Sequence, residues 1–148
     1  MKKGIYILFL ENKVTCEIQV GKLGVYTLPE GYYAYVGTAY GSGGLAARLG
    51  RHARSTKKLR WHIDYIREAM RIETAWVSSS ERIAEHYVAT ILAKQSGSET
   101  PIKGFGASDC RCPAHLFLLS ALPDMQKLNK TMLETGYSVF ENGSDYVA

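Results

Sequence analysis

The chain has 148 residues, of which 46% are hydrophobic and 22% charged, which excludes wholesale disorder and fits one globular domain. Its net charge of +4 allows an anionic partner without identifying one. The apolar run at residues 5–10 is too short to cross a bilayer, and its flanks make a poor signal peptide. Three cysteines cannot all pair within the chain, so we expect a cytoplasmic protein with no membrane partner.

The first third of the chain predicts strands. Residues 4–10 are rich in β-branched and aromatic side chains and predict a buried strand. Glu11 and Asn12 predict a hairpin turn into a second strand over residues 14–20, whose even-numbered residues share one apolar face. A Pro-Glu-Gly turn at residues 29–31 then leads into a strand over residues 32–36.

Helical patterns dominate the rest. The Gly-Ser-Gly-Gly segment at residues 41–44 breaks the chain before a helix with Leu45 and Leu49, and a second helix is expected near residues 61–66. Apolar residues at helical spacing after Ser80 predict a third helix. The remaining elements are a short strand over residues 74–77, a loop over residues 96–113, a strand over residues 115–119 and a helix over residues 123–134 that Gly136 stops.

Strands early and helices late favour an α+β fold, with a small, mainly antiparallel or mixed sheet flanked by helices. We expect a single domain over residues 1–148, with a core at about 4–120 and a C-terminal helix at about 123–135.

The positive charge is concentrated in one stretch. From Arg48 to Arg71 there are eight basic and two acidic residues, a net charge of +6, whereas the rest of the chain carries ten basic and twelve acidic residues. Basic residues interleaved with His52, Trp61 and His62 are typical of a surface that binds a phosphate backbone, although most charge runs are only solvated helix faces.

Two tripeptides and a helix motif form an ordered pattern. Gly-Ile-Tyr at residues 4–6 is followed by Tyr-Val-Gly at residues 35–37 and then by Arg48 and His52, which the i, i+4 spacing puts on one helical face. In this order they resemble the GIY-YIG nuclease superfamily. The segments at residues 31–39, 61–65, 104–112 and 115–117 resemble one branch of it, largely uncharacterised microbial domains sometimes fused to the DNA-repair glycosylase endonuclease III.

The resemblance implies metal-assisted hydrolysis of phosphodiester bonds. It implies that Tyr6 accepts a proton from water, that Tyr35 orients the reactants, and that Arg48 and His52 stabilise the phosphate. A glutamate on a later helix, Glu85, would bind one divalent ion, Mg²⁺ or Mn²⁺.

Two of these assignments have alternatives. Tyr26 lies in a second copy of the first tripeptide motif, Gly-Val-Tyr at residues 24–26, and is closer in sequence to Tyr35 than Tyr6 is. Glu81 lies four residues before Glu85 and therefore on the same helix face.

Other polar groups suggest further sites. Cys110, Cys112 and His115 have soft ligands at tight spacing, but a structural zinc site normally has four ligands with a wider first step, so a second metal or thiol site is a weaker hypothesis. The glycines at residues 41–44 precede a helix, where backbone N–H groups can contact a phosphate.

The resemblance therefore implies a metal-dependent DNA endonuclease. The alternative is a non-catalytic nucleic-acid-binding module on the same scaffold, and a third reading places the function at the cysteines. The residues expected to contact nucleic acid are Gly37, Arg51, Arg54, Lys57, Lys58, Arg60 and His62.

Overall fold

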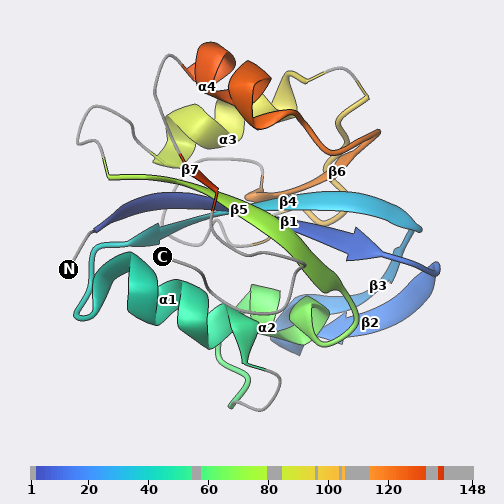
Figure 1. Ribbon diagram of the computed structural model, residues 1–148. Coiled ribbons are helices and arrows are strands. Elements are labelled where there is room, and N and C mark those ends of the chain that lie inside the picture. The colour runs from blue at the N-terminus through green and yellow to red at the C-terminus, as the bar shows by residue number, and fades with distance from the viewer. Residues whose placement is uncertain are drawn as a thin grey trace.

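The computed structural model describes residues 3–54, 58–79, 85–95, 97–103, 105, 114–132 and 137–138. They form an α+β fold, as the sequence predicts, in which an antiparallel sheet lies between two sets of helices (Figure 1). One face of the sheet packs against α1 (Gly44–Ala53) and α2 (His62–Arg67), and the other against α3 (Glu85–Ala93) and α4 (Met125–Met132). Among the described residues, no helix combines the length and apolar character that a membrane crossing requires.

The main sheet is built around its first strand. The order is β6 (Leu116–Leu119), β4 (Gly31–Ala39), β1 (Gly4–Asn12), β5 (Arg71–Ser78) and β7 (Tyr137–Ser138), and every neighbouring pair is antiparallel. The apolar run of β1 has no polar alternation because helices cover both faces of the sheet. Its even-numbered side chains enter the core beneath α1 and α2, and its odd-numbered ones enter the core beneath α3 and α4.

The predicted hairpin between the first two strands is wrong. The second strand, β2 (Cys16–Val20), pairs with β3 (Gly24–Leu28) in a separate two-stranded sheet, because β4 and β5 occupy both edges of β1. Asn12 ends β1 rather than forming a turn, and its buried side-chain amide donates to the carbonyls of Leu28 and Pro29, at 3.2 and 3.1 Å. Val14 lies outside β2 and is 65% exposed.

The first helix presents a narrow apolar stripe to the sheet. Leu45, Leu49 and His52 are its large buried side chains, and their i, i+4, i+7 spacing puts them on one face. The far end of α1 is fixed by Arg67, whose guanidinium donates to the carbonyls of His52 and Ala53, at 2.8 and 3.4 Å. The predicted polar pair of Arg48 and His52 is therefore held on a firmly seated helix.

The other predicted elements are found with shifted ends. The strands predicted over residues 32–36 and 74–77 are longer, as β4 and β5, and the strand predicted over residues 115–119 is β6 and starts at Leu116. The break at residues 41–44 is also confirmed, with Gly43 and Gly44 both at positive φ, and residues 29–30 form the short connection between β3 and β4. The start of the third helix at residues 80–84 and most of the loop at residues 104–113 lie outside the described residues.

Candidate active site

A buried tyrosine–histidine pair lies between the sheet and the first helix. The hydroxyl of Tyr6, on β1, lies 2.7 Å from Nε2 of His52, on α1, and the two side chains are only 1% and 0% exposed. Tyr6 faces Gly37 across the β1–β4 ladder. A Cβ at Gly37 would overlap the Cζ and hydroxyl of Tyr6, so this glycine provides the space that the phenol occupies.

A second tyrosine extends the pair toward the surface. Tyr35 lies on the same face of the sheet, opposite Leu8, with its ring centroid 6.3 Å from that of Tyr6 and 6.1 Å from that of His52. It is half-buried, and the ring of Phe105 meets it edge-on at 6.0 Å. The two phenols and the imidazole therefore form one aromatic cluster that reaches solvent through Tyr35.

Burial and nearby charges set the ionisation of both phenols. Burial is the main reason that the pKa of Tyr6 lies well above its ordinary value, and the charges of Tyr35 and Glu85 raise it further. The guanidinium of Arg48 lowers the pKa of Tyr6, through its charge and a hydrogen bond. The pKa of Tyr35 is also raised, by burial and then by Glu85, while Arg48 opposes the shift. Arg48 and Glu85 thus act on both phenols with opposite signs.

Arg48 is held by stacking against an indole. Its guanidinium carbon lies 4.3 Å from the ring centroid of Trp61, and that of Arg51 lies 4.1 Å from the same ring. Arg51 also forms a bidentate ion pair with buried Asp64, both N···O distances being 2.7 Å. Because the oxygens of Asp64 already hold its guanidinium, Arg51 stabilises the scaffold of the site. The contact of Arg51 with nucleic acid stays a prediction.

Asp64 connects the start of α2 to α1. One of its oxygens accepts hydrogen bonds from the backbone N–H groups of Arg60 and Trp61, both at 2.8 Å. Burial alone would raise the pKa of Asp64, but the hydrogen bonds from Arg51, Trp61 and Arg60 outweigh it and lower the pKa to about 2. Trp61 is therefore fixed beneath Arg48 by a charged hydrogen-bond network.

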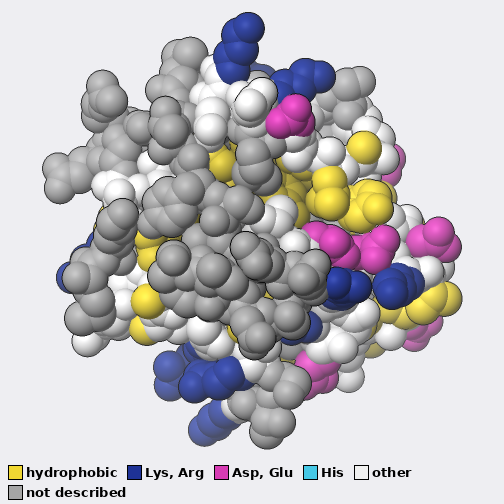
Figure 2. All heavy atoms as spheres, in the orientation of Figure 1, with side chains coloured by type: hydrophobic (Ala, Val, Ile, Leu, Met, Phe, Trp, Pro, Cys, Tyr) yellow, Lys and Arg dark blue, Asp and Glu magenta, His cyan; other side chains and the backbone are white. Residues whose placement is uncertain are grey.

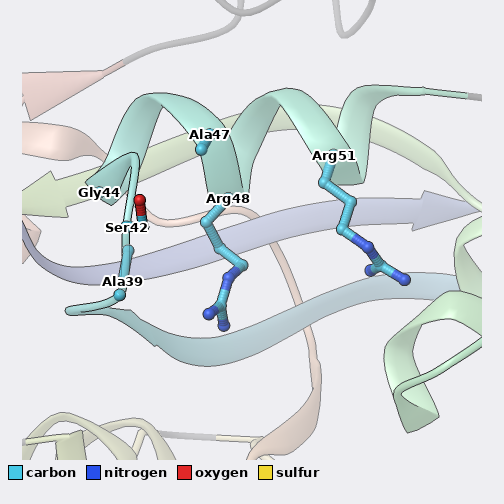
Figure 3. Close-up of a pocket in the computed structure, with 7 residues that line it drawn as sticks. Ala39, Ser42, Gly44, Ala47, Arg48 and Arg51 are labelled. Carbon is cyan, nitrogen blue, oxygen red and sulfur yellow. The ribbon is translucent and has the colours of Figure 1, made fainter.

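A pocket of about 180 Å³ opens beside the two arginines. Figure 3 shows Arg48 and Arg51 extending from the same side of α1, with Ser42 near the first turn of the helix. Gly41 and Gly44 also line it. The glycine segment, which is expected to contact a phosphate, therefore borders a pocket that positive side chains also line.

Glu85 lies beside a histidine from a distant part of the chain. Its Oε1 is 3.1 Å from Nδ1 of His115, which is buried, whereas the side chain of Glu85 is 32% exposed. In sequence, His115 lies close to the two cysteines of the predicted thiol or second metal site. Cys110 and Cys112 lie outside the described residues, as do Glu81 and Lys57.

The structure brings five predicted residues into one neighbourhood and leaves several others at its edge. The five are Tyr6, Tyr35, Arg48, His52 and Glu85. Tyr26 lies on β3 and donates instead to the carbonyl of Leu23, at 3.1 Å. His62 packs against the ring of Phe105 at 5.4 Å, and its pKa is lowered by burial. Of the basic residues predicted to contact nucleic acid, Arg54, Lys58 and Arg60 are exposed.

Sequence reasoning missed the roles of Trp61, Asp64 and Phe105. The acidic residue three positions after Trp61 was a usable signal, because an acid at the third position of a helix commonly accepts hydrogen bonds from its first backbone N–H groups. Phe105 gave no signal, since its contact with Tyr35 joins residues 70 positions apart.

The donor groups fit one hard divalent cation. Among the described residues, no three His, Cys, Asp or Glu side chains gather into a metal-binding group. Mg²⁺ is nevertheless commonly held by one or two carboxylates, with water and substrate phosphate completing its shell. Glu85 is a partly exposed carboxylate whose charge raises the pKa of both phenols, which is compatible with such a site.

Comparisons with known proteins identify a family whose function is unknown. Curated proteins give no match, and neither do solved structures. A family model matches residues 5–137, which include every described residue of the aromatic cluster and both partners of the Glu85–His115 contact. The chain therefore belongs to the family described as "Domain of unknown function DUF123".

Proposed function

We propose that this protein is a divalent-metal-dependent endonuclease that hydrolyses phosphodiester bonds in DNA, on the GIY-YIG scaffold that its sequence resembles. One observation carries the proposal: two strands and two helices bring together a phenol–imidazole pair, a second phenol, a guanidinium and a carboxylate. Cleaving an anionic phosphodiester with water needs a base, positive charge around the phosphate and a leaving-group stabiliser, and these groups can supply them.

The base is the Tyr6–His52 pair rather than the phenol alone. Because the pKa of Tyr6 is raised by burial, a free phenolate is disfavoured at neutral pH. An imidazole with its proton on Nδ1 can accept a proton at Nε2, which is 2.7 Å from the Tyr6 hydroxyl. A water that attacks phosphorus gives its proton to Tyr6 as Tyr6 gives its own to His52, so no phenolate has to accumulate.

Arg48 supplies positive charge to the phosphate. It lines the pocket beside the first turn of α1, where the glycine segment offers backbone polar groups, and its position is set by stacking on Trp61. A guanidinium in a fixed position stabilises charge that develops on the phosphate oxygens in the transition state.

Glu85 is the metal ligand in this proposal, and its charge acts on both phenols. A divalent ion, when bound, polarises the phosphate and stabilises the leaving oxygen. The carboxylate reaches solvent, so an ion and a substrate phosphate can approach it together.

The near-complete burial of Tyr6 favours a second candidate function. At 1% exposure its hydroxyl meets little solvent, which suits a module that binds nucleic acid without cleaving it. The two functions differ in product, because only the enzyme converts its DNA.

The test is a nicking assay on supercoiled and branched DNA with Mg²⁺ or Mn²⁺. We expect wild type to nick DNA, Glu85→Ala and Arg48→Ala to lose nicking, and Glu17→Ala, which removes an exposed carboxylate on β2, to retain it. Binding without nicking in wild type would support the non-catalytic module. Nicking that survives both site substitutions would show that the site is assigned wrongly.

A further inference from the structure

The contact between Glu85 and His115 has a geometry that suits two ligands of one metal ion. Oε1 of Glu85 and Nδ1 of His115 are 3.1 Å apart, which is the separation of an ion pair when the imidazole is protonated. Two ligand atoms that lie about 2.1 Å from an octahedral ion, at a right angle, are about 3.0 Å from each other. The observed separation therefore matches neighbouring positions in one coordination shell.

We propose that His115 is a second protein ligand, through Nδ1, of the divalent ion that Glu85 binds. The inference rests on the proposed function and adds to it a residue that the resemblance does not supply. His115 and Glu85 are 30 positions apart in sequence; Glu85 begins α3, and His115 directly precedes β6.

The backbone of His115 is fixed in a way that suits a ligand. Its N–H donates to the carbonyl of Phe105 at 2.8 Å, and its carbonyl accepts from the N–H of Val36 at 2.9 Å. The second contact ties the backbone of His115 to β4 one residue after Tyr35. A buried and tethered imidazole loses little further freedom when it binds an ion.

An imidazole in the ligand set changes which ion the site prefers. Mg²⁺ favours oxygen ligands, whereas mixed nitrogen and oxygen sites bind first-row transition ions more tightly. The pair of Glu85 and His115 therefore selects Mn²⁺, or a later ion of that row, over Mg²⁺. Of the two ions that the resemblance implies, Mg²⁺ and Mn²⁺, the proposed ligand pair therefore favours Mn²⁺.

Electron paramagnetic resonance of the full-length protein with Mn²⁺ alone tests the proposal without any activity measurement. We expect one bound Mn²⁺ per chain and an electron spin-echo signal modulated by a directly coordinated nitrogen. Both features should persist in His86→Gln, which changes an exposed histidine next to Glu85. His115→Gln should lose the nitrogen modulation, and its Mn²⁺ affinity should fall by at least the roughly tenfold seen when weaker outer-shell partners are removed.

The outcomes separate this inference from the proposed function. Mn²⁺ binding that Glu85→Gln abolishes, with no nitrogen modulation in wild type, overturns the role of His115 and leaves the proposed nuclease intact. Nitrogen modulation that survives His115→Gln also overturns it, because another imidazole is then the ligand. If wild type binds no Mn²⁺, or if Glu85→Gln binds Mn²⁺ as wild type does, the metal site itself is contradicted. The wild-type spectrum decides the first outcome even if His115→Gln fails to fold.

Discussion

At the scale of single residues, the glycines of the two tripeptide motifs are explained by space rather than by flexibility. A Cβ at Gly37 would overlap the ring of Tyr6, and a Cβ at Gly4 would overlap the carbonyl oxygen of Ser78 on β5. One glycine makes room for the candidate base, and the other lets the β1 strand approach β5. The glycines of the two motifs therefore allow the backbone and the Tyr6 phenol to pack closely.

Replacing Gly37 by Ala should impair the site more than the fold. The added methyl group displaces the Tyr6 hydroxyl from Nε2 of His52, and a misplacement of this kind lowers a reaction rate by roughly 10²-fold. Gly50→Ala is the matched control, because nothing lies within 4 Å of a Cβ at that helical position. Cleavage rates and thermal unfolding of the two variants check this expectation. A fully active Gly37→Ala protein would refute the steric explanation.

Replacing Arg48 by Lys should separate charge from geometry. Lysine keeps the positive charge but loses the planar fork and the stacking on Trp61. We expect the cleavage rate at saturating DNA to fall about 10²-fold while DNA affinity changes little. Arg54→Lys, at an exposed position, serves as the control. Steady-state kinetics distinguish the two parameters, and a loss confined to affinity would contradict the assigned role.

At the scale of elements, the first turn of α2 is an electrostatic anchor for α1. Asp64 joins the backbone N–H groups of Arg60 and Trp61 to the side chain of Arg51. Because its pKa is lowered from 3.8 to about 2, the ionised form is favoured in the folded protein. This stabilisation is complete above about pH 4 and disappears as the pH falls through about 2.

Asp64→Asn should therefore destabilise the protein in a pH-dependent way. The change in pKa corresponds to about 2 kcal/mol of unfolding free energy at neutral pH, since one pKa unit is about 1.4 kcal/mol. We expect the difference between wild type and the variant to be largest above pH 4 and to shrink toward pH 2. Urea unfolding at a series of pH values measures it, and a difference independent of pH would contradict the assignment.

The sequence could predict those elements whose signal is local. The apolar run of β1 and the spacing of Leu45 and Leu49 in α1 each specify an element from its own residues. The pairing of β2 with β3 could not be read in this way, because it depends on β4 and β5 occupying both edges of β1.

The same limit applies to the candidate site. Residue order indicated that Tyr6, Tyr35 and Arg48 belong to one motif, and the structure places them near each other. No local sequence pattern indicates the Glu85–His115 contact. It depends on how the segment that carries His115 packs against β4.

At the scale of the whole molecule, the concentrated positive charge lies next to the candidate site. Figure 2 shows Lys and Arg side chains at the lower rim of the molecule, below α1 and α2. Arg54, Lys58 and Arg60 are exposed in the segment between these helices, whereas Arg51 and Arg67 are bonded within the fold. The exposed residues are therefore the ones available to contact a phosphate backbone.

Replacing Arg54, Lys58 and Arg60 together by Ala should weaken DNA binding and its dependence on salt. Each lost phosphate contact reduces the slope of log affinity against log salt by about 0.9, so we expect a total reduction of about 2 to 3. Binding isotherms at several salt concentrations provide the measurement. An unchanged slope would mean that DNA binds elsewhere on the molecule.

In the proposed function, Tyr6 is part of the general base for DNA cleavage. The most direct measurement is the single-turnover cleavage rate of wild type, Tyr6→Phe and Tyr26→Phe, which each remove one hydroxyl from a tyrosine of a candidate motif. The Tyr6 hydroxyl pairs with His52, whereas that of Tyr26 donates to a backbone carbonyl. We predict that Tyr6→Phe slows cleavage by roughly 10²- to 10⁴-fold and that Tyr26→Phe leaves the rate unchanged. A wild-type cleavage rate in Tyr6→Phe, or a loss of rate only in Tyr26→Phe, would contradict the role of Tyr6 as part of the base.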